Sequence, residues 1–268
     1  MSRFPDADKR FGQHFLNSPH VISSITGTLP AAIDAIVEVG PGPAVLTPHL
    51  LKHGVPVWVV EMDKRFTELL AGILPAGHVH MQDALTVNWP MFFQDHQIRR
   101  AWMVSNLPYN VSVPLTLAFM RFEGFQTMTL MYQKEVAEKF LPPAGEKNGM
   151  SSLAALAGIF FKVSKVVDAP PGAFVPPPKV MSQVLRFERR PEPLLPLSEW
   201  SGWEEFMRVL FANRRKQMKG LLRDRIPAAV LSRFLESHGL SETVRAEALT
   251  LPQVVALAQL DREERQWQ

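Results

Sequence analysis

The stretch AIVEVGPGPAVLT, residues 35–47, joins an apolar run to a turn that contains two glycines. Its first five residues are mostly β-branched, which favours a buried strand. Gly40 and Gly42 follow, and the residues from there to Gly54 have a helical pattern of apolar side chains. Glycines at a strand-to-helix turn let the backbone approach a ligand closely, at the carboxyl edge where open α/β sheets bind their ligands. The stretch therefore predicts the first strand, turn and helix of an α/β fold.

Further apolar runs follow and alternate with helical patterns along the chain. This alternation indicates crossover connections and a mostly parallel, doubly wound sheet. Two later runs, 162–167 and 180–187, have no helical pattern between them, so we expect them to be antiparallel and to close one edge of the sheet. The predicted fold class is α/β with a seven-stranded sheet, whose strands are 35–39, 57–61, 78–81, 101–105, 128–132, 162–167 and 180–187.

A proline-rich segment, RRPEPLLPLSEW at 189–200, interrupts the strand pattern and predicts a linker. The chain beyond it has helical patterns, including RKQMKGLLRD at 215–224, and no strand pattern. We therefore predict an α/β domain at 1–190, which includes an N-terminal arm, and a small all-α domain at 191–268.

Composition narrows the possible functions. The chain of 268 residues is 46% hydrophobic and 21% charged, which is ordinary for a globular protein. It contains no cysteine, which excludes disulfides, thiolate zinc sites and thiol catalysis. The longest apolar stretches, such as LAALAGIFF at 153–161, are shorter than the roughly 18 residues that a membrane-spanning helix needs. Because the N-terminus MSRFPDADKR also lacks the apolar block of a secretory signal, we expect a cytoplasmic protein without a membrane partner or a metal site.

The glycine turn and two strand-end carboxylates predict a nucleotide-like cofactor. Glu61 ends the second predicted strand, nineteen residues after Gly42, where a carboxylate can accept both hydroxyls of a ribose. Dinucleotide-binding turns need a third glycine at the position of Val45, so S-adenosylmethionine is favoured over a nicotinamide cofactor. Asp83, which closes the third strand, then suits the adenine amino group of that cofactor. A turn without a ligand, a solvated Glu61 and a helix-capping Asp83 stay open as alternatives.

The segment SNLPYNVS, residues 105–112, directly follows a short apolar run. An exocyclic adenine amine is a poor nucleophile because its lone pair is delocalised into the ring, and hydrogen-bond acceptors can localise that pair. The Asn106 side-chain oxygen and the Leu107 carbonyl can accept from the two amino hydrogens, and Pro108 fixes the direction of that carbonyl through its locked φ. Tyr109 offers a ring on which an extruded base can stack. We therefore predict an adenine-methylating site here, the alternative being a polar turn after a strand.

These features and several other segments resemble the family of ribosomal RNA small-subunit adenine dimethyltransferases. Members of that family use S-adenosylmethionine to dimethylate the N6 amines of two adjacent adenosines near the 3′ end of 16S rRNA. The resemblance implies a class I, Rossmann-like methyltransferase fold and a monomeric enzyme that acts late in small-subunit biogenesis. The matching segments are KRFGQHFL (9–16), VEVGPGPAVLT (37–47), VVEMDKR (59–65), QDAL (82–85), NLPYNVS (106–112), MYQKEVAEKF (131–140), AFVPPPKVMSQV (173–184) and FANRRKQMKGLL (211–222).

The resemblance also implies roles for individual residues. The catalytic residues would be Asn106, Leu107, Pro108, Tyr109 and Phe174, of which Phe174 would stack on the target base from the side opposite Tyr109. Met62 and Ala84 would lie on either side of the cofactor adenine. The family commonly has asparagine at the position of His14. The full set of implied cofactor-binding residues is His14, Leu16, Gly40, Gly42, Glu61, Met62, Asp83, Ala84 and Asn106.

Basic residues predict contacts with RNA. Between Phe206 and Arg225 there are seven Lys or Arg residues and one acid, for which a solvated helix face is the alternative interpretation. With the resemblance, we expect this helix to meet RNA phosphates, which gives the 191–268 domain an RNA-binding role. The expected partner is 16S rRNA within the small ribosomal subunit or its precursor. The predicted RNA-binding residues are Arg214, Arg215, Lys216, Lys219 and Arg223 on that helix, together with Lys9 and Arg10 beside the active site.

Two other functions remain open at the level of the sequence. A related type of methyltransferase modifies one adenine of 23S rRNA, confers antibiotic resistance and shares the cofactor pocket. A nucleic-acid-binding factor could keep the fold without activity, although the intact Glu61, Asp83, Asn106 and Tyr109 argue against this.

Overall fold

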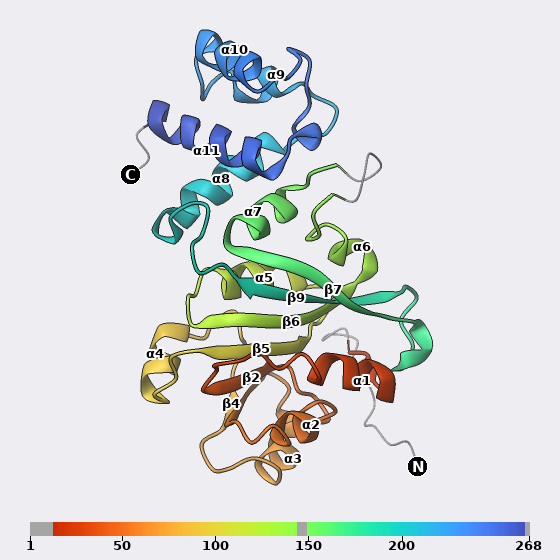
Figure 1. Ribbon diagram of the computed structural model, residues 1–268. Coiled ribbons are helices and arrows are strands. Elements are labelled where there is room, and N and C mark those ends of the chain that lie inside the picture. The colour runs from red at the N-terminus through yellow and green to blue at the C-terminus, as the bar shows by residue number, and fades with distance from the viewer. Residues whose placement is uncertain (1–12, 144–148, 266–268) are drawn as a thin grey trace. The chain divides into compact units, whose positions relative to one another are not determined.

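The computed structural model describes residues 13–143 and 149–265, which form two compact units (Figure 1). The first unit comprises residues 13–138 and 164–189, and the second comprises the remainder. The chain passes between the two units after residues 138, 163 and 189. The segment that enters the second unit at residue 139 and leaves it at residue 163 was not anticipated.

A seven-stranded sheet forms the frame of the first unit. Its strands are β2 (Ala35–Val39), β3 (Val57–Glu61), β4 (Val79–Met81), β5 (Ala101–Asn106), β6 (Phe125–Gln133), β7 (Phe161–Ala169) and β9 (Ser182–Arg189). They lie in the order β4-β3-β2-β5-β6-β9-β7. Neighbouring strands from β4 to β6 are parallel, and β9 is antiparallel to β6. The mostly parallel sheet is thus confirmed, with β9 and β7 side by side at one edge.

Helices cover both faces of this sheet. They are α1 (Pro19–Thr26), α2 (Thr47–Leu51), α3 (Thr67–Ala71), α4 (Trp89–Asp95), α5 (Ser112–Met120) and α6 (Lys134–Ala137). On one face, Trp102 of β5 belongs to a buried cluster with Val21 of α1. Phe125 of β6 lies beside Ala101 and therefore on the opposite face, where its ring contacts Trp89 of α4 edge-on. The central strands β2 and β5 are buried on both faces, as their continuous apolar runs indicate.

A separate two-stranded sheet joins the N-terminal arm, residues 13–17, to a distant segment. In it, β1 (Phe15–Leu16) pairs antiparallel with β8 (Phe174–Val175). The Asn17 N–H extends this contact by donating to the Ala173 carbonyl oxygen at 2.7 Å. The sequence did not predict the pairing, because strands of two residues carry no periodic signal. The pairing fixes the arm to the chain that leads into β9.

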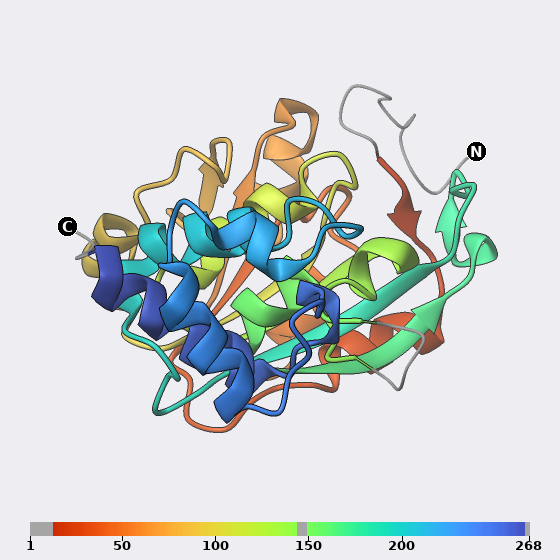
Figure 2. The same cartoon turned by 90° about the horizontal axis from the view of Figure 1, so that it is seen from above.

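The second unit is helical, which confirms the helical region predicted after the linker. Its helices are α7 (Ser152–Phe160), α8 (Trp200–Leu210), α9 (Met218–Leu222), α10 (Ala228–Ser237) and α11 (Leu251–Arg265). Trp203 and Phe206 of α8 are fully buried, and α7, α8 and α11 contact one another (Figure 1 and Figure 2). Gly158 permits the close approach of α7 to α11, because a β-carbon there would lie 2.8 Å from Leu251. This packing explains why α7, which precedes the linker, belongs to the second unit.

The sequence predicted one helix that carries Arg214, Arg215, Lys216, Lys219 and Arg223, but among these residues only Lys219 lies within a helix, α9. Helix α8 ends at Leu210, and α9 begins only at Met218. Between them, Asn213 forms a turn: its Oδ1 accepts from the Arg215 N–H at 3.1 Å, and its carbonyl oxygen accepts from the Lys216 N–H at 3.0 Å. Asparagine side chains stabilise such turns in competition with helix. We call the exposed residues 213–217 the basic turn.

A buried ion pair lies inside the second unit. Arg225 donates from Nε and Nη2 to the two carboxylate oxygens of Asp261, at 2.8 and 2.7 Å. The Asp261 side chain is 0% exposed and the Arg225 side chain 6%. Glu205, which is about half exposed, accepts from Arg225 Nη1 at 2.8 Å. The guanidinium therefore ties α11 and α8 together by charge-assisted hydrogen bonds.

Two further observations apply to the described residues. Within them, no helix combines the length and the apolar character needed to cross a membrane. Nor do three or more His, Asp or Glu side chains of this part of the chain come together as a set that could hold a metal ion.

Candidate active site

A cavity of about 450 Å³ opens at the carboxyl ends of the parallel strands β2 to β5. This volume is typical of small-molecule sites, and open α/β sheets bind ligands at this edge. The structure therefore gathers residues that lie far apart in the sequence. Those predicted residues that line the cavity are His14, Leu16, Gly40, Gly42, Glu61, Met62, Asp83, Ala84, Asn106, Leu107, Pro108 and Tyr109.

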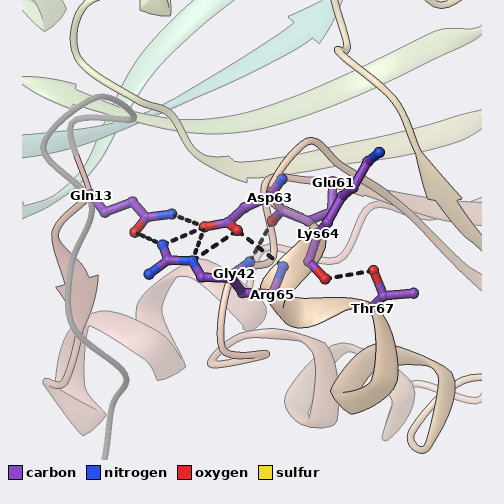
Figure 3. A network of polar contacts seen from close by, with 7 residues as sticks. All are labelled: Gln13, Gly42, Glu61, Asp63, Lys64, Arg65 and Thr67. Atoms are coloured by element: carbon purple, nitrogen blue, oxygen red, sulfur yellow. Dashed lines mark hydrogen bonds and ion pairs between the residues drawn. The ribbon is translucent and has the colours of Figure 1, made fainter.

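Glu61 ties the glycine turn to the end of β3 (Figure 3). Its Oε2 accepts from the Gly42 N–H at 2.9 Å, and its Oε1 accepts from the Asp63 N–H at 2.7 Å. Gly40 and Gly42 have φ angles of 64° and 52°, in the left-handed region that favours glycine. Burial raises the pKa of the Glu61 carboxyl, and the backbone N–H groups oppose that shift. Each carboxylate oxygen can accept a further hydrogen bond, so Glu61 can receive two vicinal hydroxyls.

Asp83 lies just beyond the end of β4. Its Oδ1 accepts from the Leu85 N–H at 2.9 Å, and its Oδ2 has no partner among the described residues. Met62, whose side chain is largely exposed, and the buried Ala84 line the same cavity. A cavity that offers an acceptor and two apolar side chains suits a flat heterocycle that carries an amino group. Asp83 is not a helix cap, because no helix starts here.

Asn106 is the last residue of β5, and its amide has a defined orientation. Nδ2 donates to the carbonyl oxygen of His14 at 3.0 Å. The amide oxygen Oδ1 has no partner among the described residues, and the side chain lines the cavity. Leu107 and Pro108 continue along the cavity wall. We call Asn106–Tyr109 the clamp, because it can present hydrogen-bond acceptors to an amine.

The clamp ends in Tyr109, which is held at both ends. Its hydroxyl and the Ser182 hydroxyl lie 2.6 Å apart. Burial raises the pKa of the Tyr109 phenol, so the ring stays neutral. The imidazole of His14 stacks on the ring, with the two centroids 5.5 Å apart, and His14 Nδ1 lies 2.8 Å from the Pro176 carbonyl oxygen. His14 thus contacts two clamp residues: its ring stacks on Tyr109, and its carbonyl oxygen accepts from Asn106.

Comparison with known proteins agrees with this geometry. The family model described as ribosomal RNA adenine dimethylase matches residues 5–260. The chain belongs to the ribosomal RNA adenine dimethylase family. It is 34% identical over 257 residues to ribosomal RNA small subunit methyltransferase A of Hahella chejuensis, covering 94% of this chain and 92% of that protein. It is 37% identical over 259 residues to the protein of the same name from Bdellovibrio bacteriovorus, covering 94% and 91%.

Solved structures of other methyltransferases share the fold of this chain. The crystal structure of 23S rRNA methyltransferase ErmE matches with a TM-score of 0.71 and 24% identity, over 92% of this chain and 99% of that one. A dimethyladenosine transferase from Plasmodium falciparum matches with a TM-score of 0.68 and 21% identity, over 92% and 98%. The Rossmann-like methyltransferase fold implied by the sequence is therefore confirmed.

Glu38 is a cavity residue that the sequence interpretation missed. It lies on β2, two residues before Gly40, lines the cavity and is 2% exposed. Its Oε2 accepts from the Thr47 hydroxyl at 2.7 Å. Burial raises the pKa of the Glu38 carboxyl to about 8, so this dimethylase carries a protonated carboxylic acid beside the cavity at neutral pH. An acid directly before a glycine turn is the signal that could have identified it.

The buried Glu38 predicts a pH-dependent stability. Between pH 4.5 and about 8 the folded chain retains a proton that the unfolded chain has lost, so the free energy of unfolding falls as the pH rises. The variant Glu38→Gln keeps the acceptor for Thr47 and cannot ionise. We expect it to gain stability relative to the wild type across this range, by about 1.4 kcal/mol per pH unit at the steepest point. Urea unfolding of both proteins at a series of pH values measures the difference, and parallel pH profiles would contradict it.

Some predicted site residues do not lie in the cavity. The ring of Phe174 is 2% exposed and packs in the buried core beside Leu16, its partner across the β1–β8 pair. A target base has no access to this ring in the structure, so the stacking role expected for Phe174 is not supported. Lys9 and Arg10 lie outside the described residues. The cations of the basic turn and α9 belong to the second unit.

Proposed function

We propose that this chain uses S-adenosylmethionine to dimethylate the N6 amines of two adjacent adenosines near the 3′ end of 16S rRNA. The observation that carries the proposal is the clamp, whose Asn106 oxygen lacks a partner among the described residues at the edge of the cavity. Family membership and relatives named ribosomal RNA small subunit methyltransferase A support the substrate. We further propose a monomer that acts in the cytoplasm late in small-subunit biogenesis.

The cavity residues fit S-adenosylmethionine as the cofactor. Glu61 retains acceptor capacity for the ribose, and Asp83 retains an oxygen for the adenine amino group. Met62 and Ala84 offer apolar surfaces to the adenine ring. Gly40 leaves open space, since apart from Gly40 and its two chain neighbours no atom of the described residues lies within 4 Å of the position its β-carbon would take. When bound, the cofactor supplies an electrophilic methyl group.

The clamp supplies the remaining chemistry. The Asn106 Oδ1 and the Leu107 carbonyl accept the two hydrogens of the target amine, which localises the nitrogen lone pair for attack. The bond from Asn106 Nδ2 to His14 keeps the oxygen, rather than the nitrogen, available for this task. Tyr109 provides the surface for the extruded base, a contact worth about 1–3 kcal/mol. The methylated amine then loses its proton to water, so no side-chain base is needed.

The proposal is tested on small ribosomal subunits that lack the modification. The protein is incubated with these subunits and with S-adenosylmethionine labelled in its methyl group, and the modified nucleotides are mapped. We expect two adjacent N6-dimethylated adenosines near the 3′ end of 16S rRNA. Label confined to 23S rRNA would favour the resistance-type activity instead. Calorimetric titration with S-adenosylmethionine and with NAD separately tests the cofactor, and binding of NAD alone would contradict it.

We expect the cations of the basic turn to strengthen the binding of RNA. Arg214 is 73% exposed and pairs only weakly with Glu247, at 3.3 Å, so both Arg214 and Arg215 can reach phosphates. We expect Arg214→Ala combined with Arg215→Ala to weaken binding to the small subunit and to reduce the slope of log K against log salt by about 1 per lost phosphate contact. Filter binding at several salt concentrations measures this slope.

A matched control removes the same charge elsewhere. Arg99 and Arg100 are adjacent, exposed and lie before β5, at the opposite end of that strand from Asn106. Arg99→Ala combined with Arg100→Ala should leave the salt slope unchanged. Equal slopes for the two double variants would show that net charge, rather than the basic turn, governs binding. Cofactor affinity should be unchanged in both.

A further inference from the structure

Gln13, in the N-terminal arm, bridges an ion pair at the cofactor side of the cavity (Figure 3). Its Nε2 donates to Asp63 Oδ2 at 2.8 Å, and its Oε1 accepts from Arg65 Nη2 at 2.9 Å. Arg65 also donates from Nε to both oxygens of Asp63, at 3.0 and 3.1 Å. The three side chains close a triangle in which a neutral amide contacts both charges. A side-chain amide suits this position because its nitrogen donates to the carboxylate while its oxygen accepts from the guanidinium.

Asp63 makes this triangle rigid and connects it to the cofactor pocket. The residue is 4% exposed, and hydrogen bonds from Arg65 lower the pKa of its carboxyl, so it is ionised at neutral pH. Its backbone N–H donates to Glu61 Oε1 at 2.7 Å. Glu61 in turn accepts from the Gly42 N–H. The triangle is therefore connected by a hydrogen bond to Glu61, the residue to which we assign ribose binding.

The other end of the connection is the clamp. His14, the residue after Gln13, supplies the carbonyl oxygen that accepts from Asn106 Nδ2. Phe15, one residue further, places its ring 3.5 Å from the position that a β-carbon of Gly42 would occupy. An arm fixed at Gln13 thus holds the carbonyl that orients the catalytic amide. If the arm shifted, Asn106 would lose the hydrogen bond to the His14 carbonyl that distinguishes its nitrogen from its oxygen.

We infer that Gln13 is a positioning residue for methyl transfer, which anchors the arm to Asp63 and Arg65 and thereby sets the orientation of the Asn106 amide through the His14 carbonyl. This inference rests on the proposed function for the reaction it assists. The anchoring itself is a property of the arm and can be measured without activity.

The test compares Gln13→Ala with the wild-type protein in steady-state methylation of small subunits at saturating S-adenosylmethionine. We expect kcat to fall by about 10- to 100-fold, as is usual when a residue that orients a reacting side chain is lost. The dissociation constant for S-adenosylmethionine should change by a smaller factor, because Glu61 keeps its bonds from Gly42 and Asp63. A loss confined to cofactor affinity, with kcat unchanged, would overturn the inference. Gln126→Ala, which removes a surface glutamine bonded only to the Glu123 carbonyl among the described residues, is the matched control and should retain full activity.

A charge exchange tests whether the triangle, rather than the glutamine alone, is responsible. Gln13→Glu places two carboxylates together and should lower kcat as Gln13→Ala does. Adding Asp63→Asn again gives one carboxylate and one amide, with the carboxylate now at position 13 and the amide at position 63. Arg65 can then pair with the carboxylate at position 13, and the amide at position 63 can donate to that carboxylate. The double variant should therefore recover much of the kcat lost in Gln13→Glu. Failure to recover, with cofactor binding intact, would count against the triangle.

Hydrogen exchange gives a readout that does not depend on catalysis. The Asn17 N–H is bonded to the Ala173 carbonyl and reports whether the arm stays in place. We expect faster exchange at residues 15–17 in Gln13→Ala and unchanged exchange in Gln126→Ala. Unchanged exchange in Gln13→Ala would overturn the anchoring. A wild-type protein that shows the protected arm but methylates no small-subunit RNA would instead refute the proposed function.

Discussion

Asn106→Ala is expected to lower the rate of methyl transfer by about 100- to 1000-fold, the usual cost of removing one hydrogen-bonding group aimed at the charge that develops in a transition state. The loss should appear in single-turnover rates, because the amide oxygen acts on the reacting nitrogen. S-adenosylmethionine affinity, measured by calorimetry, should change far less, since Glu61 and Asp83 are untouched.

A second variant separates the two halves of the amide. Asn106→Asp keeps an acceptor oxygen but loses the donor to the His14 carbonyl. We expect an intermediate rate, because the acceptor remains while its orientation is no longer specified. Wild-type turnover in Asn106→Ala would remove the basis for the clamp.

Asp261→Ala is expected to lower the free energy of unfolding by about 3–5 kcal/mol, because it leaves the buried guanidinium of Arg225 without its main partner. A guanidinium stays protonated in proteins, so Arg225 remains a buried cation when its hydrogen bonds to Asp261 are lost. Urea denaturation followed by tryptophan fluorescence can measure the loss, since Trp203 is buried in the same unit.

The second partner of Arg225 provides the control. The Glu205 side chain is 49% exposed, and exposed ion pairs contribute about 0–1 kcal/mol. Glu205→Ala should therefore destabilise the protein much less than Asp261→Ala does. Equal losses would show that burial does not decide the strength of this pair.

The parallel strands were predictable because their signal is local. The bounds of β2 and β3 are the predicted ones, since β-branched runs that are buried on both faces end at glycine or charged residues. Strand β6 begins at Phe125, three residues before the predicted start at residue 128, because the Phe125 ring packs with Trp89 and Phe119. The turn after β2 also contains a left-handed residue that is not glycine: Ala44 adopts a φ of 57°, and its residue type gives no sign of this conformation.

The features that the sequence did not reveal depend on distant contacts. The positions of Phe174 and Gln13 follow from the β1–β8 pair and the Asp63 triangle, whose members are far apart in the chain. The basic turn failed as a predicted helix because Asn213 satisfies two backbone N–H groups outside a helix. Glu38 was missed because its burial, not its residue type, gives it an unusual protonation state.

The order of the strands has a consequence for how the chain matures during translation. Strand β9 is the last of the sheet to be synthesised, yet it lies between β6 and β7. A nascent chain that has not yet extended past Ser182 therefore has open backbone edges on both flanking strands, and such edges pair readily with other chains. The N-terminal arm must also wait for its partner, because β1 is synthesised first and β8 is synthesised only after six strands of the large sheet. The sheet that carries the cavity therefore closes only after residues 182–189 have emerged from the ribosome, and the strands made earlier wait for that last one.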